Sequence, residues 1–123
     1  MIGAVKPESA SEVQLGYLGA GYAFRAMLYL DMAQSFEFLE NDKTSATNKS
    51  GNNVLNLTVP IVTEATTEEE ARNNPRVTRE EMAEFILSDL NKAEEYIPNL
   101  NIATKTLPHL DVVYGLKARY YMW

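Results

Sequence analysis

The chain has 123 residues, of which 46% are hydrophobic and 23% charged, and this composition indicates one globular domain rather than a disordered segment. Its 17 acidic and 11 basic residues give a net charge of −6, which argues against a nucleic-acid partner, because phosphate contacts need a surplus of Lys and Arg. No cysteine is present, so the composition excludes disulfides and thiolate metal sites.

The first predicted element is a long helix over residues 11–38, with Ser9 or Ser11 as its N-cap. Apolar side chains nearly encircle its axis, which is typical of a helix buried among other elements. A glycine in a helix interior costs about 1 kcal/mol relative to alanine. Small residues nevertheless recur on one broad face at three- and four-residue spacings, namely Gly16, Gly19, Ala20, Ala23 and Ala26. We interpret this face as the place where a second helix packs unusually closely.

Arg25 lies on the same predicted helix, between Tyr22 and Tyr29 at helical spacing. We favour a partly buried guanidinium, stacked on tyrosine and paired with a carboxylate of a neighbouring helix, over one that faces a ligand. Asp31 lies about 120° further around the axis and is not expected to be its partner.

Five tyrosines on predicted helices are expected to be core rather than sugar-stacking platforms: Tyr17, Tyr22, Tyr29, Tyr114 and Tyr121.

Residues 40–76 are predicted to form a long polar loop followed by extended chain. Four amides of the loop either hydrogen-bond sugar hydroxyls or are simply solvated, and we favour solvation: Asn48, Asn52, Asn53 and Asn56. The β-branched residues around Pro60 predict one short strand or edge segment over 54–64. The acidic run that follows is expected to hold one helical turn and to break at Pro75.

A second helix is predicted over residues 78–97. Thr78 and Glu81 form the Thr-x-x-Glu capping box, and Pro98 ends the pattern. Its apolar face recurs at helical spacing through Met82, Ile86, Leu90, Ala93 and Ile97.

A third helix is predicted over residues 109–123, after Pro108. Its apolar face is expected to comprise Leu110, Val113, Tyr114, Leu116, Ala118, Tyr121 and Met122.

The chain stops at Trp123 without a helix stop signal, so we expect residues 1–123 to be one helical domain excised from a larger protein. The apolar surface near residues 120–123 is expected to drive self-association. The predicted fold is all-α: about three long antiparallel helices, arranged as in tetratricopeptide repeats.

Catalytic and metal-binding patterns are missing from the sequence. His109 is the only histidine, and we expect it to cap a helix or face solvent. No phosphate-binding loop, nucleophile elbow or transition-metal spacing is present. The sequence therefore predicts a protein that is not an enzyme, with no catalytic residue, no metal and no cofactor.

Four segments of the chain resemble the SusD-like (RagB/SusD) lipoproteins of bacterial outer membranes. GYAFRAMLYLDMAQSF (21–36) resembles the family's helix around Phe-(Leu)-Arg-Ala, and VPIVTEAT (59–66) resembles its Val-Pro-Leu-Val-Thr-Glu segment. NPRVTREEMAEFILSDLNKAEEYIP (74–98) is similar to its helix with Ile-x-x-Asp-Leu, and LDVVYGLKARYYMW (110–123) to its helix with Ala-Arg-x-Tyr-Leu.

The resemblance implies a tetratricopeptide-like scaffold within a cell-surface protein that captures oligosaccharides or polysaccharides for import with a TonB-dependent transporter. It implies a surface-exposed lipoprotein of the outer membrane, although the family's lipidated cysteine is absent here. The loop over 40–58 is longer than the family pattern predicts. No glycan-contact position of the family can be matched to this chain, so no carbohydrate-binding residue is assigned. From the residues alone, the alternative is a helical-repeat module that binds another protein.

Overall fold

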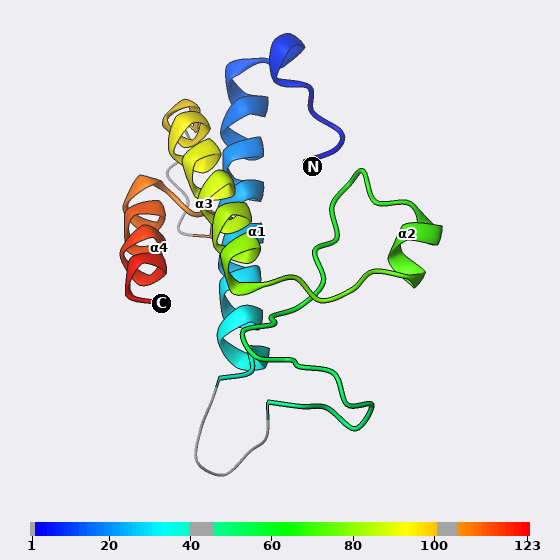
Figure 1. The fold of residues 1–123 in the computed structure, drawn as a ribbon. Helices are drawn as coiled ribbons and strands as arrows, with labels where there is room; N and C mark the ends of the chain where they lie inside the picture. Colours follow the sequence, from blue (N-terminus) through cyan, green and yellow to red (C-terminus); the bar gives the residue numbers. More distant parts are fainter. Residues whose placement is uncertain (1, 40–45, 101–105) are drawn as a thin grey trace.

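A computed structural model describes residues 2–39, 46–100 and 106–123, and these residues form an all-α fold with no sheet (Figure 1). Three long helices carry the fold: α1 (Glu12–Phe36), α3 (Arg79–Tyr96) and α4 (Leu110–Met122). The shorter elements are the helix α2 (Glu68–Arg72) and two 3-10 turns, η1 (Pro7–Ser9) and η2 (Ile97–Asn99). Consecutive long helices run antiparallel, α1 to α3 and α3 to α4 (Figure 1).

The helix starts are fixed by local hydrogen bonds. Thr78 Oγ1 accepts from the Glu81 N–H and the Glu81 carboxylate accepts from the Thr78 N–H, so the predicted capping box is confirmed. At α1 the cap is Ser11, which exchanges the same two bonds with Gln14. Ser9, the other candidate cap, belongs to η1. The helical turn expected before Pro75 is α2, which ends at Arg72.

The core lies between α1 and α3, and α4 closes one side of it. All five predicted core residues of α3 and η2 are buried: Met82, Ile86, Leu90, Ala93 and Ile97. From α1 they meet Leu18, Tyr22, Ala23, Ala26, Tyr29, Leu30 and Ala33. From α4 only Val113 and Leu116 are fully part of this core.

The small-residue face of α1 is packed as the sequence predicts. Gly16 and Gly19 are buried where the start of α1 crosses η2. A Cβ built on Gly19 would lie 2.7 Å from the backbone N of Ile97, and one built on Gly16 would lie 2.7 Å from Cα of Leu100. These distances leave no room for a methyl group, so glycine is needed at this crossing because backbone meets backbone.

The apolar face predicted for α4 is partly wrong. Tyr114, Tyr121 and Met122 are exposed, at 51%, 72% and 82%, and Ala118 is exposed as well. Tyr120 and Trp123 are half-buried against the core instead. On the helical wheel they lie within about 40° of the buried Leu116, whereas Tyr121 and Met122 lie about 120–140° away from it. The side chains near the end of the chain are therefore divided between a packed and an exposed face.

Polar contacts fix the end of α4. The Trp123 Nε1–H donates to Glu37 at 2.9 Å, and Arg79 lies 4.6 Å from the centre of the Trp123 ring while pairing with Glu37. Arg119 of α4 pairs with Asp31 of α1, so Asp31 is not paired with Arg25, as expected.

The segment between α1 and α3 contains no strand among its described residues, so of the two readings of the extended segment around Pro60 the short strand is not formed. Two isolated bridges occur instead, Thr47 with Asn53 and Leu57 with Thr78. A few backbone hydrogen bonds join residues 56–59 to residues 77–79, and side chains such as Tyr29 and Arg76 add further bonds, but no continuous ladder forms. The start of the predicted loop, 40–45, lies outside the described residues.

No helix in the described part of the chain has the length and hydropathy needed to cross a bilayer.

Candidate functional site

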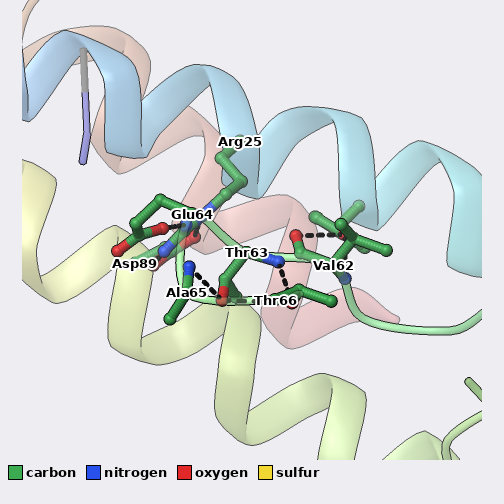
Figure 2. A network of polar contacts seen from close by, with 8 residues as sticks. Arg25, Val62, Thr63, Glu64, Ala65, Thr66 and Asp89 are labelled. Atoms are coloured by element: carbon green, nitrogen blue, oxygen red, sulfur yellow. Dashed lines mark hydrogen bonds and ion pairs between the residues drawn. The ribbon is translucent and has the colours of Figure 1, made fainter. Parts of the chain in front are cut away.

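Arg25 is the centre of a polar cluster between α1, α3 and the segment 59–66 (Figure 2). Its Nε and Nη2 donate to the two carboxylate oxygens of Asp89 on α3, at 2.6 and 2.8 Å. Its Nη1 donates to Glu64 at 2.9 Å. The guanidinium lies 5.0 Å from the centre of the Phe85 ring and 5.4 Å from that of Tyr22. The predicted stacked and paired arginine is confirmed.

The segment 59–66 is anchored beside this cluster. The Tyr29 hydroxyl donates to the Val62 carbonyl and accepts from the Val62 N–H, at 2.9 and 2.8 Å. A turn follows in which Thr66 Oγ1 accepts from the Thr63 N–H and Thr63 Oγ1 accepts from the Ala65 N–H (Figure 2). These bonds hold Glu64 where its carboxylate meets Arg25.

The ionisation of the cluster follows from these contacts. The hydrogen bonds to Asp89 raise the pKa of Arg25 further above its usual value. The pKa of Glu64 is lowered by the hydrogen bond from its own backbone N–H and by Arg25. Burial raises the pKa of Tyr22. All three groups therefore hold their ordinary charge at neutral pH, and both oxygens of Asp89, which is 1% exposed, are occupied by Arg25. The cluster is a structural centre rather than a reactive one.

The tyrosines divide between core and surface. Tyr22 and Tyr29 are buried and Tyr17 is half-buried, as expected of core residues. The core prediction is wrong for Tyr114 and Tyr121, which are exposed. Tyr120 and Tyr121 line a small hollow of about 250 Å³ together with Arg79 and Trp123.

A larger hollow of about 480 Å³ lies where three segments meet: the residues after α1, the loop 46–54 and the residues before α3. Its apolar lining includes Phe38, Leu57 and Pro75. Three of the four loop amides singled out by sequence line it, namely Asn48, Asn52 and Asn53. Asn56 does not; it has a positive φ of 59° and its N–H donates to the Phe38 carbonyl. The hollow therefore combines an apolar surface with amides, as small-molecule sites do.

Arg76 completes the lining of this hollow. Its Nε donates to the Thr58 carbonyl, and its Nη2 donates to the carbonyls of Phe36 and Leu57. Sequence reasoning did not select Arg76 or Phe38, because nothing in the local pattern shows that residues 38 and 76 meet. Only the fold places them beside the loop.

A second hollow of about 470 Å³ lies between the segment 61–66 and α2. Its polar groups are largely used by the chain itself. The Glu70 carboxylate accepts from the Thr67 N–H, and the Asn74 amide donates to the Ile61 carbonyl.

His109 occupies the N-cap position of α4, without a side-chain bond to the helix N–H groups. Across residues 2–39, 46–100 and 106–123, no group of three or more His, Asp and Glu side chains is arranged to hold a metal ion.

Comparison with models of known protein families finds no match to this chain, and comparison with curated proteins finds none either.

Proposed function

We propose that this chain is the helical scaffold of a cell-surface glycan-binding protein of the SusD-like kind, with a tetratricopeptide-like arrangement of its helices. In this role it belongs to an outer-membrane lipoprotein that captures oligosaccharides and passes them to a TonB-dependent transporter. The protein binds and does not catalyse.

One observation carries this proposal: three of the segments that resemble the family meet at a single cluster. Arg25 comes from the Phe-Arg-Ala pattern, Glu64 ends the Val-Pro-x-Val-Thr-Glu pattern, and Asp89 belongs to Ile-x-x-Asp-Leu. These residues are 39 and 64 positions apart from Arg25, yet they form one ion-paired group. A shared physical contact explains why the three patterns occur together, which supports a common architecture over chance likeness of short motifs.

Isothermal titration of the parent protein against a panel of oligosaccharides tests the proposal. We expect micromolar or tighter binding of at least one glycan, and we expect a strain lacking the protein to import that glycan more slowly. If no glycan binds and the deletion leaves import unchanged, the proposal is wrong.

A second candidate function, a helical module that binds another protein, is favoured by the outer face of α1. Phe24, Leu28, Met32 and Phe36 recur every four residues and are 36–62% exposed. Such an apolar row on a helix matches the way one helix docks against another. The row explains why apolar residues nearly encircle α1: one face packs on α3, and this one has no cover among the described residues.

We expect the isolated chain to self-associate through this row, since a contiguous apolar surface is unfavourable in water. Leu28→Glu places a charge in its middle and should weaken association at least tenfold, as measured by sedimentation equilibrium. Val112→Glu is the matched control, because Val112 is also exposed but lies in the first turn of α4, where a carboxylate is tolerated. A wild-type chain that stays monomeric at millimolar concentration would contradict this expectation.

A further inference from the structure

Among the polar side chains that line the hollow at Arg76, those of Asn48, Asn53 and Arg76 offer donors to a ligand. The Asn48 side-chain oxygen accepts from the N–H groups of Ser50 and Asn52, at 2.9 and 3.0 Å. The Asn53 side-chain oxygen accepts from the Leu55 N–H at 2.9 Å. Because all three partners are N–H donors, the oxygens must face the loop, and what the two amides can offer a ligand is their NH₂ groups.

Arg76 adds a positive charge and N–H donors that the described residues do not use. Its three hydrogen bonds to carbonyls use Nε and Nη2, so the N–H groups of Nη1 make no bond to the described residues. No carboxylate of those residues forms an ion pair with Arg76. The three carbonyls fix the orientation of the guanidinium before any ligand arrives, which lowers the entropic cost of binding.

The apolar part of the lining selects the shape of the ligand. Phe38 is held by two backbone bonds, with its N–H donating to Leu57 and its carbonyl accepting from Asn56. Together with Pro75 it gives the hollow an apolar surface, which suits a sugar ring, whose C–H face is apolar while its edge is polar. A purely apolar ligand would leave the amides and the guanidinium unpaired, which is unfavourable.

We propose that this hollow binds one uronic acid ring of an acidic oligosaccharide, with its carboxylate facing Arg76 and the NH₂ groups of Asn48 and Asn53. A carboxylate only accepts hydrogen bonds, so it complements a donor-rich lining better than a hydroxyl does, and its bond to a guanidinium is charge-assisted. The net charge of −6 does not prevent this contact, because salt screens charges more than about 10 Å away at 0.1 M. The inference rests on the proposed glycan-binding function and names its ligand class and site.

The test is an NMR titration of the ¹⁵N-labelled 123-residue chain with trigalacturonic acid and trimannuronic acid. Galactotriose and mannotriose serve as their neutral counterparts. We expect the side-chain NH₂ signals of Asn48 and Asn53 to shift with at least one acidic trimer. We expect the neutral counterpart of that trimer to bind at least tenfold more weakly.

Asn53→Asp is the decisive variant. A carboxylate oxygen still accepts from the Leu55 N–H, so the loop keeps its hydrogen bond, but the NH₂ donor is replaced by a negative oxygen. We expect a loss of affinity of tenfold or more with an unchanged circular dichroism spectrum. Asn91→Asp, on the exposed face of α3, makes the same change in charge away from the hollow and should bind as the wild type does.

Equal binding by Asn53→Asp and the wild type, shifts confined to other residues, or no binding of either acidic trimer would each overturn the inference. None of these results decides the proposed function, which the titration and import measurements on the parent protein test separately. A glycan captured by the parent protein but not at this hollow would leave the function standing and the site wrong.

Discussion

Gly19→Ala is expected to destabilise the fold by about 1–3 kcal/mol, although alanine is the better helix former. The added Cβ would lie 2.7 Å from the Ile97 nitrogen and 3.0 Å from the Tyr96 carbonyl carbon. Backbone atoms cannot rotate aside as the end of a long side chain can, so α1 and η2 must separate. The contacts of Leu18 and Ile97 in the core would loosen with them. Urea unfolding followed by circular dichroism measures the change.

Gly115→Ala is the matched control for this prediction. Gly115 lies within α4, and a Cβ built there meets nothing within 4 Å. The same substitution should therefore stabilise the protein by up to about 1 kcal/mol, because only helix propensity acts. Opposite signs at the two glycines would show that packing decides at Gly19. A stabilising Gly19→Ala would contradict the close crossing of α1 and η2.

Arg25→Ala is expected to cost about 3–5 kcal/mol, a larger loss of stability than that expected for Gly19→Ala. It would leave the Asp89 carboxylate, 1% exposed, without the two bonds that neutralise it. Glu64 also loses a partner, but its side chain is 44% exposed and water can replace the bond, so its loss adds little. Thermal or urea unfolding measures the effect.

The double variant Arg25→Met with Asp89→Leu separates charge from packing. Both charges are removed together and the volume is largely kept, so no unpaired charge stays buried. We expect it to be at least about 2 kcal/mol more stable than Arg25→Ala. If the double variant is as unstable as the single one, the cost comes from lost packing against Phe85 and Tyr22 rather than from an unpaired Asp89.

The elements predicted correctly are those whose signals are local. The Thr78–Glu81 capping box and the apolar spacing from Met82 to Ile97 define α3 within one stretch of chain, because a helix forms its hydrogen bonds four residues apart. Gly16 and Gly19 likewise predict that another part of the chain packs closely against α1. Glycine lowers the stability of a helix, so its presence there needs a compensating contact. No strand forms near Pro60 because the pairing of residues 56–59 with residues 77–79 is limited to a few backbone hydrogen bonds and one isolated bridge, and β-branched composition does not show how far a pairing extends.

The candidate site shows the opposite case. Sequence indicated the loop amides as possible contacts, but it favoured a solvated loop and gave no sign of Arg76 or Phe38. Their meeting depends on contacts between residues 18 to 40 positions apart, such as those of Arg76 with Thr58 and Phe36. Contacts between residues so far apart produce no periodic pattern in the sequence.

Local patterns are enough to predict the all-α class and, to within two residues, the bounds of the long helices, because both depend on interactions within a few residues. The small residues of α1 also predict that another part of the chain packs closely there, but the fold is needed to identify it as Ile97 and Leu100. Only the tertiary structure decided that Arg25 joins Glu64 and Asp89, that Tyr121 and Met122 face outward, and that a hollow forms beside Arg76. These outcomes depend on the rotation of each helix against its neighbours and on long-range loop contacts, which local propensities do not encode.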